Sequence, residues 1–232
     1  MKGAIKVLSG AIDKLIMSIF VLMTLLGLYA LYDSYSLFLN AQDKGLLSYK
    51  PQPDSVSEEV PLEGYVAWLT LDNTDIDFPI MQGIDNDEFL NKDPYGNYSL
   101  SGSIFLDYRN SADFTDEYSL IYGHHMEHGA MFGALDNYRK RPYYRSHRDG
   151  MLMVGGKTYK LHIFAAAAPF ADEMVVFDPS DTDKESIMKF IKDNSLYYDE
   201  PDELDGDRIL ALSTCSSNGS IERFVVFAMV EP

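Results

Sequence analysis

Two apolar segments near the end of the chain, RILALSTC (208–215) and RFVVFAMV (223–230), give the clearest indication of fold. Both are rich in aliphatic and aromatic residues and are bounded by polar ones, which is typical of β-strands. If the two strands pair as a hairpin, Cys215 and Arg223 lie near the same end of it. We therefore expect a cysteine and an arginine to meet where two apolar strands are joined.

Further strands precede these two, with few helices between them. The segment 150–170 predicts a hairpin, because alternating apolar runs flank Gly155-Gly156. Pro79 cannot donate a ladder hydrogen bond, so the short strand 76–80 is expected at an edge or a bulge. This succession predicts a mainly β fold, either a barrel or a sandwich with short helical insertions, rather than alternating strands and helices. Other strands are expected within 66–71, 103–107 and 118–125.

The longest helix expected after the N-terminal region covers residues 181–198. Thr182 or Asp183 fits its N-cap, where a side-chain oxygen accepts a hydrogen bond from the first turn. Apolar side chains recur along it at helical spacing and therefore share one face, namely Ile187, Phe190 and Ile191. Shorter helical turns are expected at 87–90 and 131–138.

The composition indicates a folded protein and argues against a nucleic-acid binder. Hydrophobic residues make up 46% of the 232 residues and aromatic residues 13%, more than disordered chains contain. The formal net charge is −17, whereas phosphate binding requires clustered Lys and Arg. We interpret this acidity as a contribution to solubility. The single cysteine excludes an intramolecular disulfide.

An uncharged apolar run from Leu15 to Tyr32 predicts a helix that spans a membrane, which requires about 20 apolar residues. Lys2, Lys6 and Lys14 precede it, so the positive-inside rule places the N-terminus in the cytoplasm. A retained signal-anchor is favoured over a cleaved signal peptide, because no small-x-small cleavage site ends the run. A buried core helix is the third alternative.

These features divide the chain along its length. We expect a cytoplasmic N-terminus at 1–14, a single transmembrane signal-anchor at 15–39, a juxtamembrane linker or helix at 40–63 and an extracellular globular domain at 64–232. A free thiol outside the cell is a liability unless it is buried or used. The predicted location at the cell membrane therefore makes Cys215 a candidate functional residue.

Cys215 ends an apolar strand and precedes a polar loop, a position where a rigid scaffold presents a side chain to a substrate. A buried structural cysteine is the alternative. His124 and His125 end another expected strand, and a nearby histidine can pair with the thiolate and protonate a leaving amine. Because adjacent strand residues point to opposite faces, only one of the two can meet Cys215. A surface loop residue is the alternative for each.

Arg223 begins the next strand, where a guanidinium can donate to a substrate carbonyl and stabilise developing oxyanion charge. The alternative is an ordinary arginine paired with Glu222. A metal site built on His124 and His125 is disfavoured, because no Cys or carboxylate falls at ligand spacing. The other histidines are expected to be structural: His128, His147 and His162.

The segment ALSTC (211–215), followed by Arg223, resembles the T-L-x-T-C signature of sortases, and IYGHHM (121–126) resembles their histidine segment. One departure is Ala211, which stands where the family signature begins with threonine, at a position that is not catalytic. Longer stretches resemble class B sortases in type and order, at 64–83, 101–110 and 128–150.

The resemblance implies an eight-stranded sortase β-barrel and a cysteine transpeptidase. It implies that Cys215 attacks the threonine carbonyl of a C-terminal sorting signal on a secreted protein. His124 would act as acid and base, and Arg223 would hold the substrate oxyanion. Ser213 and Thr214 border the nucleophile and are expected to line the substrate groove. An amine of a cell-wall precursor would resolve the thioacyl enzyme, and neither a cofactor nor a metal is implied.

Two other classes are open on the sequence alone. L,D-transpeptidases place a histidine almost next to the cysteine, whereas His124 lies far upstream of Cys215, and papain-like peptidases place the cysteine first. A membrane-tethered binding module with an incidental cysteine is the non-enzymatic alternative. The sequence distinguishes neither the sorting motif, N-P-x-T-like or P-P-x-T-like, nor the acceptor amine.

Overall fold

The computed structural model describes residues 2–41, 44–53, 60–126, 129–201, 208–215 and 221–231. Within these ranges it describes only the backbone at 2–9, 37–41, 44 and 215. The chain divides into two compact units, Met1–Asn40 and Ala41–Pro232. The expected linker segment PQPDSVSEE lies largely outside the described residues, because 54–59 are not among them.

The first unit is formed by one long helix, α1 (Lys2–Ala41). Its stretch Gly10–Ser36 covers 27 residues with a mean hydropathy of 2.2, and its most apolar part is 0% buried. By length and composition this stretch can cross a membrane, and a signal sequence has the same properties.

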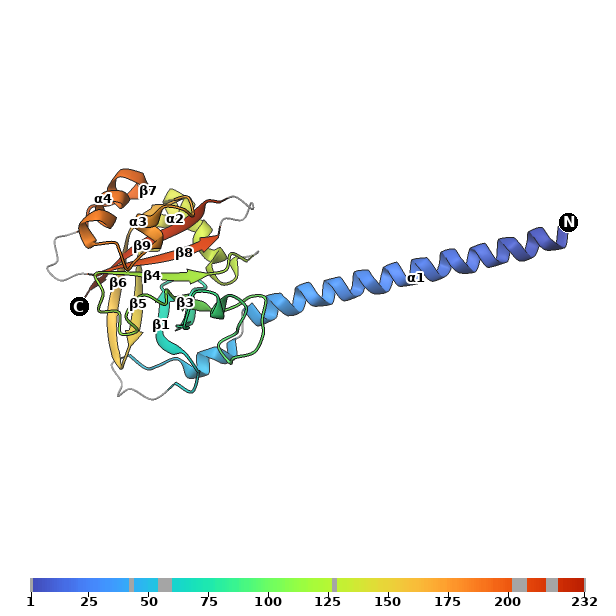
Figure 1. Ribbon diagram of the computed structural model, residues 1–232, viewed down its shortest axis with the longest axis horizontal. Helices are drawn as coiled ribbons and strands as arrows, with labels where there is room; N and C mark the ends of the chain where they lie inside the picture. The colour runs from blue at the N-terminus through green and yellow to red at the C-terminus, as the bar shows by residue number, and fades with distance from the viewer. Residues whose placement is uncertain are drawn as a thin grey trace. The chain divides into compact units, whose positions relative to one another are not determined.

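The second unit is a closed β-barrel (Figure 1). Eight strands follow one another in the order β5-β1-β2-β3-β4-β8-β9-β6, and β6 pairs with β5 to close the barrel. The expected mainly β barrel is therefore confirmed, and the sandwich alternative is wrong. The strands are β1 (Tyr65–Leu71), β2 (Asp77–Met81), β3 (Ile104–Leu106), β4 (Tyr118–Gly123), β5 (Asp149–Val154), β6 (Lys157–Ala167), β7 (Ser195–Tyr198), β8 (Arg208–Cys215) and β9 (Arg223–Glu231).

The C-terminal hairpin is present as predicted, with β8 antiparallel to β9 and Cys215 opposite Arg223. On its other side β8 runs parallel to β4, so that Gly123 lies opposite Thr214. The end of β4, the end of β8 and the start of β9 therefore lie together at one rim of the barrel. The hairpin predicted around Gly155-Gly156 is also confirmed, as β5 and β6.

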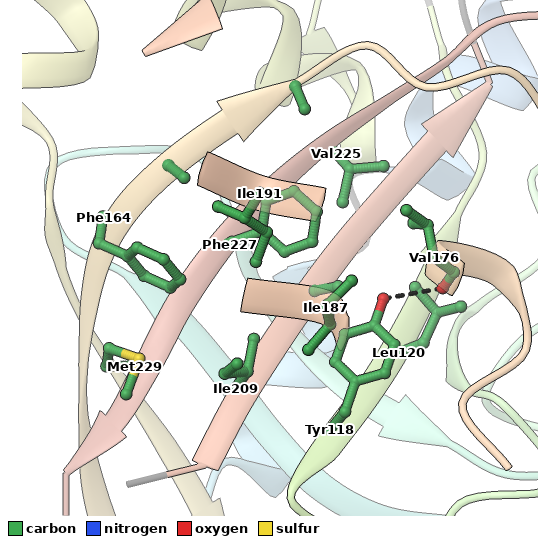
Figure 2. Packing of buried hydrophobic residues seen from close by; sticks show 13 residues of the cluster. Tyr118, Leu120, Phe164, Val176, Ile187, Ile191, Ile209, Val225, Phe227 and Met229 are labelled. Atoms are coloured by element: carbon green, nitrogen blue, oxygen red, sulfur yellow. Dashed lines mark hydrogen bonds between the residues drawn. The ribbon is translucent and has the colours of Figure 1, made fainter. Parts of the chain in front are cut away.

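One face of β4, β6, β8 and β9 is covered by two helices, α3 (Met174–Phe177) and α4 (Lys184–Asn194) (Figure 2). Asp183 caps α4 by accepting a hydrogen bond from Ser186 N at 2.7 Å, as one of the two predicted caps. The predicted apolar face of α4 is confirmed, since Ile187 and Ile191 are fully buried against the sheet. The Tyr118 hydroxyl donates to the carbonyl of Val176 at 2.8 Å and so fixes α3 to the barrel.

The helix predicted to extend to Tyr198 ends at Asn194, and Ser195–Tyr198 forms β7 instead. β7 pairs with β6 beyond the part that β5 occupies, where Ala165 lies opposite Tyr198. An unpaired sheet edge there would leave backbone groups without partners, and the tyrosines at the end of the segment favour an extended chain.

Pro79 has the edge-like environment expected for a proline in a strand. It lies opposite Trp68 of β1, and β3 pairs with β2 only from Ile80 onward. Within the described part of the chain, Pro79 therefore has a paired strand on one side only. The predicted helical turns at 87–90 and 131–138 are also confirmed, as η2 (Glu88–Leu90) and η4 (Phe132–Arg139). The described residues also form the short helices η1 (Lys44–Tyr49) and α2 (Arg141–Ser146).

Candidate active site

A pocket of about 220 Å³ lies at the rim where β4 and β8 end and β9 begins. Four of the side chains predicted from the sequence line it, which are His124, Ser213, Thr214 and Arg223. Cys215 follows Thr214 directly, and its backbone pairs with that of Arg223. The Cys215 side chain lies outside the described part of the structure. The barrel thus places the backbone of the predicted nucleophile next to residues of this pocket.

His124 follows β4 and is held by a backbone group. Its Nε2 atom lies 2.7 Å from the carbonyl oxygen of Leu90, which ends η2. Phe89 of the same turn is 1% exposed and packs in a cluster with Trp68 and Phe105. The carbonyl that holds the histidine ring therefore belongs to a turn anchored in the core.

Gly123 explains why the chain comes so close to the barrel before His124. A Cβ at this position would lie 2.5 Å from Ile104 Cδ1 and 2.7 Å from Phe132 Cγ. No side chain fits there without displacing both neighbours. The glycine therefore lets the end of β4 pack between β3 and η4.

His125 lies on the other side of the chain, as the alternation of strand residues predicted. It lines a different pocket, of about 760 Å³, and its Nε2 atom lies 2.8 Å from Asp136 Oδ2. The expected strand 118–125 is too long, since β4 ends at Gly123 and His125 makes an isolated bridge with Met131. The bridge keeps the chain extended for two residues more, so the two histidines still diverge.

The other predicted residues form the wall of the pocket. Ser213 and Thr214 are 2% and 1% exposed, and they lie on β8 between β4 and β9. The backbone N–H of Arg223 donates to the carbonyl of Pro169 at 2.8 Å, which fixes the start of β9. Of the histidines expected to be structural, His147 stacks on Tyr143 with 3.7 Å between the ring centroids, and His162 Nδ1 lies 3.1 Å from Asp149 Oδ1. His128 lies outside the described residues.

The sequence did not identify six of the ten residues that line the pocket. Its remaining lining residues come from the segment around η2, from β3 and from β4, and are Asn86, Asp87, Leu90, Phe105, Tyr122 and Gly123. The segment 87–90 was expected only as a helical turn. Its one signal was the polar run Asp85-Asn86-Asp87 after a strand, which is common in loops without any function. Among the described residues, no group of three or more His, Cys, Asp or Glu is placed to hold a metal ion.

Known proteins resemble this chain over most of the barrel. Residues 69–231 match the sortase domain. Sortase B of Listeria monocytogenes is 35% identical over 160 residues, which cover 68% of this chain and 65% of that protein, slightly less than two thirds of its length. Sortase B of Staphylococcus aureus is 29% identical over 185 residues, which cover 77% of this chain and 75% of that protein.

A solved structure agrees in fold as well as in sequence. The crystal structure of a class B sortase from Streptococcus pyogenes, described as involved in pilus biogenesis, aligns with a TM-score of 0.67. It is 40% identical and covers 72% of this chain and 92% of that one. The family domain includes the strands that form the rim and its pocket. The chain therefore belongs to the sortase family, and its relatives are class B members.

Proposed function

We propose that this protein is a membrane-anchored cysteine transpeptidase that joins secreted proteins to an amine of a cell-wall precursor. The observation that supports this most is the pocket at the barrel rim. His124, Thr214 and Arg223 line it, and the backbone of Cys215 pairs with that of Arg223. These are the residue types that thiol-based acyl transfer requires.

In the proposed first half-reaction, the Cys215 sulfur attacks the threonine carbonyl of a sorting signal. The thiol proton of Cys215 passes to His124, the C–N bond after threonine breaks, the leaving amine takes this proton from His124, and a thioester forms on Cys215. Arg223 donates hydrogen bonds to the oxyanion that develops on the carbonyl. Ser213 and Thr214, together with Asn86 and Tyr122, form the wall against which the peptide lies.

In the second half-reaction an amine attacks the thioester. Neutral His124 takes a proton from this amine, and the C–S bond to Cys215 breaks. A new amide then joins the secreted protein to the molecule that carries the amine. Because a relative from Streptococcus pyogenes is described as involved in pilus biogenesis, an amine on another protein is a second acceptor class to be tested.

The apolar stretch Gly10–Ser36 of α1 supports membrane anchoring in this proposal. Lys2, Lys6 and Lys14 lie before or at its beginning, which favours a cytoplasmic N-terminus and a catalytic domain outside the cell. Residues 15–39 would then span the membrane, residues 40–63 would link the membrane span to the catalytic domain, and residues 64–232 would form that domain.

The full chain in detergent tests the proposal with quenched peptides that carry N-P-x-T-like or P-P-x-T-like motifs. The wild-type protein should cleave peptides of one motif class. When the reaction is stopped before turnover is complete, the protein should carry the acyl group of the peptide. Because the chain has one cysteine, a mass increase that hydroxylamine removes is assigned to Cys215 without ambiguity. Cys215→Ala should lose both signals and unfold at nearly the wild-type temperature. A wild type that cleaves no motif, or a Cys215→Ala variant that still cleaves, would contradict the proposal.

A further inference from the structure

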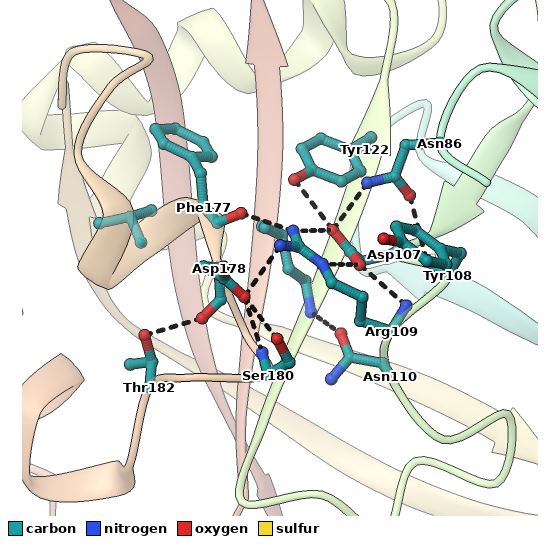
Figure 3. Close-up of polar contacts among 12 residues, drawn as sticks. Asn86, Asp107, Tyr108, Arg109, Asn110, Tyr122, Phe177, Asp178, Ser180 and Thr182 are labelled. Atoms are coloured by element: carbon teal, nitrogen blue, oxygen red, sulfur yellow. Dashed lines mark hydrogen bonds and ion pairs between the residues drawn. The ribbon is translucent and has the colours of Figure 1, made fainter.

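A buried carboxylate is hydrogen-bonded to two side chains that line the pocket (Figure 3). Asp107 follows β3, and its side chain is 0% exposed. Its Oδ2 atom accepts a hydrogen bond from Asn86 Nδ2 at 2.9 Å and another from the Tyr122 hydroxyl at 3.2 Å. Both donors line the pocket, whereas Asp107 itself does not. Among the described residues, Asp107 is therefore connected to the pocket by hydrogen bonds from these two side chains.

The amide of Asn86 is fixed at both ends. Its Oδ1 atom accepts a hydrogen bond from the backbone N–H of Tyr108 at 3.0 Å, while Nδ2 donates to Asp107. An amide presents a donor at one end and an acceptor at the other. The two bonds together therefore determine which end of Asn86 a ligand in the pocket meets.

The protonation states match this arrangement. Burial raises the pKa of Tyr122, and the negative charge of Asp107 raises it further, so the hydroxyl keeps its proton and donates. Burial alone would raise the pKa of Asp107, but hydrogen bonds from Arg109 and Asn86 outweigh burial and hold that pKa below its usual value. Asp107 is therefore an ionised acceptor at neutral pH.

Every polar neighbour of the Asp107 side chain is a donor among the described residues. Oδ1 accepts from the backbone N–H and the Nε atom of Arg109, at 3.0 and 2.9 Å, and Oδ2 accepts from Arg109 Nη2 at 2.8 Å. An asparagine in place of Asp107 would point the N–H groups of its amide at neighbouring hydrogen-bond donors, where the carboxylate accepts hydrogen bonds. The change from Asp to Asn is therefore a sharp perturbation at nearly constant volume.

Arg109 extends the network to the helix that covers the barrel. Its Nη2 atom donates to the carbonyl of Phe177 at 2.7 Å, and Nη1 lies 2.8 Å from Asp178 Oδ1. Two ion pairs that share Arg109, one with Asp107 and one with Asp178, thus connect the end of α3 to the pocket residues.

We propose that Asp107 is a positioning residue for the pocket, which holds Asn86 and Tyr122 in the orientation in which they contact a bound sorting peptide. This inference rests on the proposed transpeptidase function for the identity of the ligand. Asp107 is not among the residues that line the pocket, and it acts through the two side chains that it orients.

The first test compares Asp107→Asn with Asp77→Asn in the full chain. Asp77 is a matched control, because it too accepts three kinds of donor, from Lys50 at 2.7 Å, Trp68 at 2.6 Å and Thr70 at 2.9 Å, and does not line the pocket. Asp107→Asn should lower kcat/KM for the sorting peptide about 10- to 100-fold, mainly through KM, because peptide positioning is lost. The rate at which iodoacetamide alkylates Cys215 should stay near the wild-type value. An Asp107→Asn loss no larger than that of Asp77→Asn would overturn the proposal.

A second variant keeps the proposal testable where Asp107→Asn folds poorly, because an unchanged KM in Tyr122→Phe would by itself contradict the proposed contact. Tyr122→Phe keeps the ring and removes only the hydroxyl that donates to Asp107, so KM should rise by a smaller factor. If both residues act through one contact, the double variant should lose little more than Asp107→Asn alone. Fully additive losses would show that Asp107 does not act through Tyr122.

A third readout needs no turnover and separates the inference from the function on which it rests. The side-chain amide signals of Asn86 in a ¹H–¹⁵N spectrum are identified by their loss in Asn86→Ala. Asp107→Asn should shift these signals, and Asp77→Asn should not. If the Asn86 signals are unchanged in Asp107→Asn, the positioning role is overturned even when the wild type is active. If the signals shift in Asp107→Asn but the wild type has no activity, only the proposed function is contradicted.

Discussion

The Nε2 atom of His124 lies 2.7 Å from the carbonyl oxygen of Leu90. A carbonyl oxygen only accepts hydrogen bonds, so the neutral imidazole carries its proton on Nε2 and leaves Nδ1 as the acceptor. The orientation and tautomer of the proposed acid–base residue are thus set by the backbone of η2. Since Phe89 anchors this turn in the core, anything that moves η2 should move the histidine.

Substitution of Gly102 tests this dependence. Gly102 has φ +58°, and a Cβ there would collide with the carbonyl oxygen of Leu90. Gly102→Ala should therefore displace the acceptor of His124 and lower kcat/KM about tenfold or more. The strained backbone should also reduce the free energy of unfolding by about 1–3 kcal/mol. Peptide cleavage and thermal unfolding of the full chain measure the two effects.

Gly96→Ala is the matched control for that experiment. Gly96 also has a positive φ, of +89°, but its nearest neighbour to a new Cβ is Lys92 Cε at 3.8 Å. The variant carries comparable backbone strain without touching η2, so it should lose stability and keep its activity. Equal losses of activity in Gly96→Ala and Gly102→Ala would show that the Leu90 carbonyl is not what matters.

The two adjacent histidines should differ strongly when each is replaced by alanine. His124 lines the pocket at the rim, and its loss should lower kcat by about 10²–10⁴-fold, the usual range for an acid–base group. His125 instead contacts Asp136 at 2.8 Å in another pocket, so its loss should lower kcat less than about tenfold. Parallel peptide assays at matched protein stability measure both, and similar losses would void the choice of His124.

The rim of the barrel was predictable because it depends on local patterns. Apolar runs of strand length and the register of one hairpin place Cys215 opposite Arg223. The strand period of two predicts that His124 and His125 point to opposite sides. Both inferences use residues that are neighbours in the chain or in one hairpin.

The rest of the site depends on contacts that no local pattern encodes. Leu90 meets His124, and Asn86 meets Asp107, only because η2 and β3 dock on β4 in the barrel. The predicted end of the helix at Tyr198 was wrong for a related reason. The helix ends at Asn194 because the free edge of β6 pairs with the segment that follows, β7. Pairing partners from distant parts of the chain override local helical preference.

Arg223→Lys tests whether charge alone is sufficient at the start of β9. Lysine keeps the positive charge and loses the planar fork that donates several hydrogen bonds at once. If Arg223 stabilises the oxyanion, kcat should fall about 10²–10³-fold with little change in thermal stability. Arg208→Lys is the control, because Arg208 lies at the other end of the same hairpin, opposite Val230, and should retain activity. Wild-type kcat in Arg223→Lys would exclude a role that depends on the guanidinium.

The dependence of the unfolding temperature on acidic pH should show whether Asp107 is ionised in the folded protein. Because its pKa is lowered in the folded protein, Asp107 stabilises the fold at pH values above its unfolded pKa of about 3.9. This contribution is lost as the pH falls through the lower, folded-state pKa. Asp107→Asn should therefore be less stable than wild type at pH 7, and the difference in unfolding temperature should shrink as the pH falls below about 4. Tyr122→Phe keeps the carboxylate and should follow the wild-type acid limb. Curves for wild type and Asp107→Asn that stay parallel from pH 7 to pH 2.5 would mean that Asp107 is not held ionised by its donors in the folded protein.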